Sequence, residues 1–337
     1  MKKILTITVA VGIFLMCSCT RNTEDVREIF AMDTYMTVKC YGENSKKAND
    51  EAEEMIKLLD SILNVESDGS DIYALNENGG GTVGEEVSPM IEKALVIASQ
   101  TDGAFDISIR PLVKLWGFPE GVLHIPTDEE LEEVLPLIDS SKIKLNGSEI
   151  TLGEGQSVDL GGIAKGYAAD TVADIYRDNG VVSGIISLGG NVLTIGSKPD
   201  GSAWKVGISV PDKDGAGTDY FAVLSLRGQC VITSGGYERY LTGDDGQIYH
   251  HILDPKTGYP SKSGLKSVSI VSTDCTLADA LSTAVFVMGY DRAVEFWREY
   301  DGVAFDMVLV EDAGDIFITE GIKDVFSSEE SFTVIEK

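Results

Sequence analysis

The stretch Val158–Asp170 reads V-D-L-G-G-I-A-K-G-Y-A-A-D, and the rest of the chain is interpreted from it. Three glycines, Gly161, Gly162 and Gly166, flank Lys165. Glycine has no Cβ, so a strand that runs through glycines into a helix brings its backbone close to a ligand. The first turn of a helix also offers unpaired N–H groups to an anion. The stretch therefore predicts a strand-to-helix junction that binds phosphate, and a tight turn without a ligand is the alternative.

Length and charge limit the possible classes of protein. The 337 residues are enough for one large domain or two small ones, and helical and strand patterns alternate along them, which predicts an α/β or α+β class. The net charge of −28 argues against nucleic acid and anionic lipid as partners. A polyanionic ligand would need a local positive site from a metal ion, a lysine or a helix N-terminus.

The N-terminus has the pattern of a targeting segment. Lys2 and Lys3 precede an apolar run, Ile4–Met16, which ends at Cys17-Ser18-Cys19. Residues 1–18 therefore read as a signal peptide, and the cysteines resemble a bacterial lipobox in which small Ser18 precedes the lipidated Cys19. An ordinary cleaved signal and an uncleaved anchor are the alternatives. Residues 19–29 are expected to form a polar tether before a domain over 30–337.

Three cysteines remain after this segment, at positions 40, 230 and 275. They are far apart in the sequence and lack C-x-x-C spacing, which argues against a zinc or redox motif. We expect them to be buried, unreactive thiols.

The glycine stretch resembles the signature D-L-G-G-I-A-K-G-Y-A of the ApbE family, the FAD:protein FMN transferases. Other stretches match that family in the same order: G-A-F-D at 103–106, P-L-V-K-L-W-G-F at 111–118, T-S-G-G-Y-E-R-Y at 233–240, H-I-L-D-P-K-T-G-Y-P at 251–260 and T-L-A-D-A-L-S-T-A at 276–284. The resemblance runs from about Phe30 to Gly289. It implies an ApbE-type α+β (mixed α/β) fold with FAD in a central cleft.

Asp279 and Thr283 are four residues apart in an apolar, periodic stretch, so they share one face of a helix that we expect Thr276 to cap. A carboxylate and a hydroxyl are hard oxygen ligands that suit Mg²⁺. The resemblance places a Mg²⁺ on these two positions and adds the backbone carbonyl of Gly162, and in some relatives the position of Ser282.

The resemblance also implies a set of residues around FAD. The stretch Phe30–Val38 reads as a strand in which Met32 packs on the flavin, although Asp33 replaces the family's usual glycine. Where many relatives have an aromatic residue against the flavin this chain has Glu66, and Tyr73 is the alternative contact. The other cofactor-binding residues that the resemblance implies are Ala104, Phe105, Asp106, Asp159, Lys165 and Leu253.

His251 stands at the end of an expected strand, just before the turn Asp254–Gly258. A histidine titrates near neutrality and can accept a proton from a hydroxyl, so His251 is the candidate general base. A purely structural role, bracing the turn, is the alternative.

The resemblance as a whole implies an enzyme outside the cytoplasm that uses FAD and Mg²⁺. It would transfer FMN from FAD to a threonine or serine hydroxyl of an acceptor protein and release AMP. Flavin-carrying subunits of Nqr or Rnf electron-transport complexes are the implied acceptors, and a lipid anchor is the implied link to the membrane. An FAD pyrophosphatase that yields FMN and AMP, a flavin-binding lipoprotein without catalysis, and a general solute-binding lipoprotein are the alternatives, of which the metal pair disfavours the last.

Replacement of the candidate lipidation residue, Cys19→Ala, is expected to release the protein from the membrane fraction or to leave its signal peptide unprocessed. Acylation would supply most of the membrane affinity, because an acidic surface gains nothing from anionic lipid. Fractionation and the mass of the mature chain measure both effects. Normal processing with unchanged membrane association would exclude Cys19 as the lipidated residue.

Overall fold

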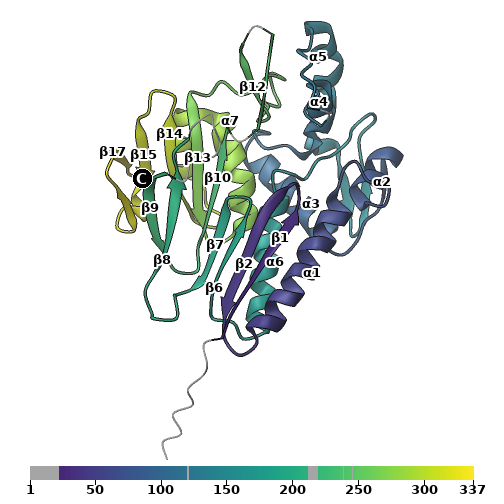
Figure 1. The fold of residues 1–337 in the computed structure, drawn as a ribbon. Helices are drawn as coiled ribbons and strands as arrows, with labels where there is room; N and C mark the ends of the chain where they lie inside the picture. The colour runs from purple at the N-terminus through teal and green to yellow at the C-terminus, as the bar shows by residue number, and fades with distance from the viewer. Residues whose placement is uncertain (1–22, 120, 212–218, 238, 245) are drawn as a thin grey trace, which may run out of the picture.

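A computed structural model describes residues 23–119, 121–211, 219–237, 239–244 and 246–337 (Figure 1). The expectations on residues 1–22, which include the signal peptide and Cys19, lie outside the described residues. Mixed helices and strands confirm the predicted α+β class.

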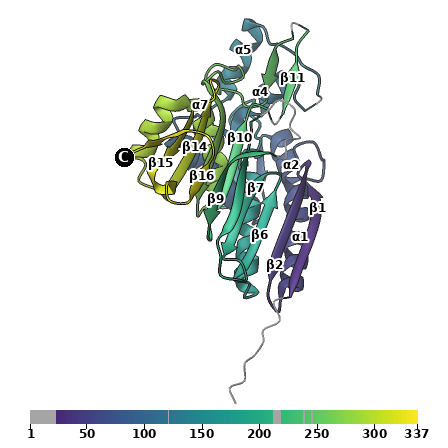
Figure 2. The same ribbon diagram turned by 60° about the vertical axis from the view of Figure 1, so that its left-hand side comes forward.

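A large sheet runs through the middle of the protein (Figures 1 and 2). In the described part of the chain it has nine strands in the order β1-β2-β6-β7-β10-β13-β14-β15-β17. Neighbouring strands are antiparallel, apart from the parallel pair β15 and β17. The strands are β1 (Glu24–Ala31), β2 (Thr34–Tyr41), β6 (Ser183–Leu188), β7 (Asn191–Gly196), β10 (Cys230–Gly235), β13 (Leu265–Ser272), β14 (Phe305–Glu311), β15 (Ile316–Thr319) and β17 (Phe332–Ile335).

Three helices cover one face of this sheet: α1 (Ser45–Leu63), α6 (Ala164–Asp178) and α7 (Cys275–Glu299) (Figure 1). Helix α1 is amphipathic and buries Ala52, Ile56 and Leu59 on one side. Helix α7 is buried along most of its first fourteen residues, and its backbone leaves the helical region at Gly289, where φ is 76°. This helical layer and the sheet enclose the main hydrophobic core.

A second sheet packs on the opposite face. It consists of β8 (Trp204–Ser209), β9 (Tyr220–Leu226) and β16 (Phe326–Ser328), in the order β16-β9-β8. Ile208 and Leu224 from this sheet share a hydrophobic cluster with Val271 and Val308 of the large one. The six residues 267–272 of β13 are consequently all buried, because that strand is covered from both sides.

Four of the remaining elements, α4, α5, β11 and β12, lie together at one end of the large sheet (Figures 1 and 2). A third hydrophobic cluster, which includes Leu112, Trp116, Leu131 and Leu253, holds this end together. The elements outside the layers described above are α2 (Asp71–Asn78), β3 (Gly80–Thr82), α3 (Val87–Gln100), α4 (Arg110–Leu115), α5 (Asp128–Val134), β4 (Lys144–Asn146), β5 (Glu149–Thr151), β11 (Tyr240–Thr242) and β12 (Ile248–His250), with short 3-10 helices at Ile107–Ile109, Leu135–Leu137, Ser140–Lys142 and Glu320–Ile322.

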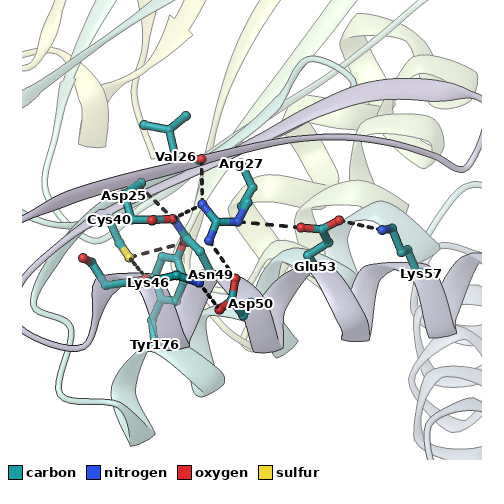
Figure 3. Close-up of polar contacts among 11 residues, drawn as sticks. Asp25, Val26, Arg27, Cys40, Lys46, Asn49, Asp50, Glu53, Lys57 and Tyr176 are labelled. Carbon is teal, nitrogen blue, oxygen red and sulfur yellow. Dashed lines mark hydrogen bonds and ion pairs between the residues drawn. The ribbon is translucent and has the colours of Figure 1, made fainter.

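The folded part begins earlier than the expected tether over 19–29 allows, because β1 starts at Glu24. Polar contacts hold this edge strand to α1 (Figure 3). Arg27 donates to Asp50 at 2.7 Å, and Asn49 donates to the backbone carbonyl of Asp25 at 2.9 Å and to its carboxylate at 3.0 Å. Asp25 and Arg27, which lie in the stretch expected to be a solvated tether, therefore contact side chains of α1.

The single strand expected over Phe30–Val38 is instead a hairpin. Strands β1 and β2 pair through a two-residue turn, Met32-Asp33, in which both residues have positive φ, 49° and 57°. A turn of this kind twists in the same sense as the strands beside it. Asp33 can stand where the family has glycine because aspartate tolerates the left-handed conformation better than most residues.

In the described ranges, no helix is both long enough and apolar enough to cross a membrane. Cys40, Cys230 and Cys275 are buried free thiols, as expected. Burial is the main cause that raises the pKa of Cys40 to about 11, so this thiol is not ionised at neutral pH.

Candidate active site

The glycine stretch leads into α6, but no strand precedes it. Residues 156–160 lie outside any β-ladder, contrary to the prediction from the sequence. The side chain of Asn76 takes the place of a neighbouring strand: it accepts a hydrogen bond from the Val158 N–H at 2.6 Å and donates to the Val158 carbonyl at 2.9 Å. The next residue, Asp159, donates its N–H to the carbonyl of Ile107 at 2.8 Å. Extended backbone is thus held in place without a sheet.

The carboxylate of Asp279 joins three segments of the chain. It stands on α7 and is buried, with 5% of its surface exposed. One oxygen accepts from the backbone N–H of Gly166 at 2.8 Å, and the other accepts from the side-chain amide of Asn191 at 3.0 Å. The carboxylate therefore fixes the first turn of α6 and the start of β7 relative to α7.

Gly166 allows this contact because α6 and α7 approach each other closely there. A Cβ at Gly166 would lie 2.2 Å from the carbonyl oxygen of Cys275 and 2.7 Å from Cβ of Asp279. Both distances are far shorter than real Cβ contacts. The third glycine of the motif is thus required by helix packing as well as by any ligand.

The other proposed metal ligands lie beside this contact. A Cβ on Gly162 would lie 3.8 Å from Oγ1 of Thr283 and 3.2 Å from the ring of Phe105. In the described part of the chain the Gly166 N–H donates to Asp279 instead of making the helical bond to the Gly162 carbonyl four residues earlier, which leaves that carbonyl without this partner. The fold therefore brings the glycine motif close to Thr283, which is the arrangement that the resemblance implies.

These residues fit Mg²⁺ as a sparse oxygen site. They offer one carboxylate, one hydroxyl and one backbone carbonyl, the ligand types that Mg²⁺ prefers. Among the described residues no group of three or more His, Cys, Asp or Glu side chains could hold a metal ion. A metal ion here would need further oxygen ligands from water or from a phosphate. Ser282 is already engaged, since its hydroxyl donates to the carbonyl of Asp279 and bonds Ser234 Oγ, both at 2.7 Å.

Two carboxylates hold the N-terminus of α7, five residues before Asp279. The helix begins at Cys275 with Asp274 as its N-cap, so the expectation that Thr276 caps it is wrong. Asp274 accepts from the N–H of Leu277 and also pairs with Lys93 at 2.6 Å. Asp170 on α6 accepts from both the N–H and the hydroxyl of Thr276. Aspartate stabilises this helix N-terminus better than threonine would, because its negative charge also complements the helix dipole.

His251 follows β12 and is partly buried. Its Nδ1 lies 3.0 Å from the carbonyl oxygen of Arg239, which can only accept, so Nδ1 carries the proton. The other nitrogen, Nε2, then has a free lone pair and points to a role as proton acceptor. Burial, with a smaller contribution from the nearby charges of Arg239 and Lys165, lowers the pKa of His251 to about 4, so the ring is neutral at physiological pH.

The three residues of the turn after α3 that the resemblance assigns to FAD differ in how far they are engaged. Ala104 and Phe105 are buried, and the Phe105 ring lies against Gly162. The carboxylate of Asp106 accepts from the N–H groups of Ser108 at 2.8 Å and Ser140 at 3.0 Å and from both of their hydroxyls. Its side chain thus holds the turn together inside the protein.

Met32, Lys165 and Leu253, also assigned to FAD, lie on separate elements. The N–H of Met32 donates to Asp60 at 2.7 Å, and its side chain packs partly buried against the main core. Lys165 stands partly exposed in the first turn of α6. Leu253 is buried in the third cluster with Trp116, which donates to the Gly258 carbonyl at 2.7 Å in the turn that the sequence predicts. Direct flavin contact of these residues stays a prediction.

Glu66, at the position where relatives have an aromatic residue, is 61% exposed and pairs with Arg110 at 2.8 Å. Arg110 is buried, and its other terminal nitrogen, Nη1, has no partner among the described residues. Tyr73 lies on α2 and is partly exposed. A contact of the flavin with Glu66, or with Tyr73 as the alternative, stays a prediction.

Sequence reasoning missed two asparagines that organise the site. Asn76 lies on α2 and braces Val158, and Asn191 follows the glycine pair of a tight turn and holds Asp279. An asparagine inside an apolar stretch is the only local signal, because its partner is distant in sequence.

The chain resembles known proteins over most of its length. The model of the ApbE family matches residues 32–305. The FAD:protein FMN transferase of Treponema pallidum (strain Nichols) is 34% identical over 274 residues, which cover 74% of this chain and 75% of that protein. That of Klebsiella pneumoniae (strain 342) is 33% identical over 272 residues, covering 79% and 83%.

Solved structures give the same result. The ApbE protein from Thermotoga maritima superimposes with a TM-score of 0.82 at 33% identity, covering 90% of this chain and 99% of that chain. The flavinyl transferase ApbE of Pseudomonas stutzeri, in its apo form, gives a TM-score of 0.79 at 28% identity, covering 91% and 98%.

Replacement of the third glycine, Gly166→Ala, is expected to lower the free energy of unfolding by about 1–3 kcal/mol, because its Cβ would force α6 and α7 apart. At an ordinary helical position the same change stabilises a protein, so the sign is informative. The control is Gly161→Ala, whose Cβ would meet only a side-chain oxygen of Asp159, at 3.0 Å. Urea unfolding measures both, and a Gly166→Ala variant as stable as the parent would contradict the close approach of the helices.

Proposed function

This chain belongs to the ApbE family, and from that premise we propose that it transfers FMN from FAD to the hydroxyl of a threonine or serine in an acceptor protein and releases AMP. One observation carries the proposal. Asp279, Thr283 and the glycine motif, which are far apart in the sequence, meet at the start of α6. A partly exposed lysine of the same turn, Lys165, lies close enough to His251 to lower its pKa.

Asp279, Thr283 and the Gly162 carbonyl would hold a Mg²⁺ ion. When bound, the metal would supply positive charge against the diphosphate of FAD and the leaving AMP. The Asp279 carboxylate is held by the Gly166 N–H and by Asn191, so its oxygens are in position before any ligand arrives. Lys165 would place a further positive charge near the phosphates, which a chain of net charge −28 needs locally.

His251 would move the proton. Its Nδ1 is held by the carbonyl of Arg239, and Nε2 would take the proton from the acceptor hydroxyl. The oxygen then forms a bond to the phosphorus of the FMN moiety, and the bond from that phosphorus to the AMP oxygen breaks. The new product is a phosphoester between FMN and the threonine or serine, and AMP leaves with the electron pair of the broken bond.

The acceptor and the location follow from the same proposal. The acceptors are extracytoplasmic flavin-carrying subunits of the Nqr or Rnf type, and the enzyme is a bacterial lipoprotein held at the membrane through Cys19. Two features of the sequence support this location: the apolar N-terminal run and the small residue before Cys19.

The Asp279→Ala variant is expected to lose Mg²⁺-dependent turnover of FAD while FAD still binds, because it removes the only carboxylate among the proposed ligands. It also leaves two buried donors unpaired, so its stability must be measured in parallel. Asp279→Asn is the matched variant, since it removes the charge and keeps an oxygen for the Gly166 N–H. Normal Mg²⁺-dependent turnover by the asparagine variant would exclude this metal site.

The His251→Asn variant is expected to transfer FMN about 10²–10⁴-fold more slowly while its FAD affinity changes little. Because the pKa of His251 is lowered to about 4, the parent's rate should stay level as the pH falls from neutrality and decline only toward that value. The variant should lack this decline. Single-turnover transfer by FAD-saturated enzyme across pH measures both, and a rate within a few-fold of the parent with an unaltered profile would remove His251 from the mechanism.

A further inference from the structure

Two aromatic side chains are exposed side by side at the end of the β1–β2 hairpin. Phe30 and Tyr35 face each other across the strands, with ring centroids 5.1 Å apart. Phe30 is 62% exposed and Tyr35 is 83% exposed. Aromatic rings that are paired and yet this open to water are typical of surfaces that become covered by a partner.

The layers of the fold explain why the pair is uncovered. Ile29 and Ala31 of β1 face the helices and are buried, so Phe30 points to the opposite face of the sheet. On that face the second sheet packs its apolar side chains against β10, β13, β14 and β15, which are distant from β1 in the strand order. Among the described elements, that cluster reaches neither Phe30 nor Tyr35.

The pair is continuous with the candidate active site. Next to Tyr35, Thr34 packs against Gly189 in the β6–β7 turn, where a Cβ would lie 2.6 Å from the threonine methyl, and the Gly189 N–H donates to the Tyr35 carbonyl at 3.2 Å. Two residues after Gly189, Asn191 donates to Asp279. In both views the β1–β2 turn lies at the end of the sheet nearest β11 and β12, which lead to His251 (Figures 1 and 2).

The position of the aromatic pair and the charges around it indicate which molecule would cover it. Strand β1 begins at its other end, away from the aromatic pair, so the pair lies at the end of the hairpin that is close to the candidate active site (Figure 1). Glu28 and Asp33 are exposed on either side of Phe30 in the sequence. An apolar surface with acidic residues around it is complementary to an apolar segment flanked by lysine or arginine.

We propose that Phe30 and Tyr35 form a docking surface for the acceptor protein, which presents an apolar side chain with basic neighbours close to the hydroxyl that receives FMN. This inference rests on the proposed function. The surface would bind the acceptor and not FAD, so it would set the KM for the acceptor and leave the binding of the flavin nucleotide unchanged.

The test uses Phe30→Ser and Tyr35→Ser in the full enzyme, with Tyr220→Ser as the matched control. Tyr220 is also 62% exposed, but it lies on β9 of the second sheet. The acceptor probe is the extracytoplasmic domain of an Rnf-type flavin-carrying subunit. Transfer is followed by its covalent mass increase, and FAD affinity is followed by quenching of flavin fluorescence.

Each variant at the pair is expected to lower kcat/KM for the acceptor by about tenfold, the loss typical of an aromatic residue at the centre of an interface, with FAD affinity and the urea midpoint unchanged. The Tyr220→Ser control should behave as the parent. A Glu28→Lys variant should also raise the acceptor KM, and by less as the salt concentration rises.

Four outcomes would overturn the proposal. If the parent transfers FMN and both serine variants transfer it equally well, the pair is not a docking surface, and the proposed function is unaffected. If the variants lose FAD affinity together with transfer, the pair belongs to the flavin site. A dimer of the parent that the variants dissociate would make a second copy the occupant. If the parent transfers no FMN to the subunit, the proposed function is refuted for this acceptor, and so is the docking surface proposed for it.

Discussion

The buried carboxylate of Asp279 is the contact on which the site depends. It accepts hydrogen bonds from the Gly166 N–H and from the Asn191 side chain, and so joins α6, α7 and the start of β7. The absence of a side chain at Gly166 makes this possible, since a Cβ there would overlap the backbone of α7. A buried charge is costly unless it is hydrogen-bonded. Here the two donors offset that cost and also fix where the oxygens point.

The same carboxylate is proposed to bind a metal ion, and the two roles are compatible. Each carboxylate oxygen has more than one lone pair, so an oxygen that accepts from the protein can still contact a cation. The site has few protein ligands, and its remaining partners would have to come from phosphate and water. A site of this kind favours metal and FAD binding together. This agrees with the proposal that the metal would act on the diphosphate of FAD.

The local features were predictable from the sequence where a single motif contains all the interacting residues. The amphipathic pattern of α1, the turn at Gly258 and the shared face of Asp279 and Thr283 are of this type. Predictions from the sequence were wrong where a contact with a residue distant in the sequence determines the local structure. Asp25 looks like part of a solvated linker because its partner Asn49 lies 24 residues later, and Val158 looks like a strand end because the bracing Asn76 lies 82 residues earlier. The cap of α7 is a different case: Asp274 caps the helix from only two residues before Thr276, and Thr276 instead donates to Asp170 on α6.

The most direct measurement is the intact mass of the acceptor after incubation with this protein, FAD and Mg²⁺, with the nucleotide products separated in the same reaction. The account predicts that the acceptor gains the mass of FMN on one threonine or serine, with one AMP released for each acceptor modified. An unmodified acceptor with FMN and AMP free in solution would make the protein an FAD pyrophosphatase. Intact FAD would make it a flavin-binding protein, and either of these results would contradict the account.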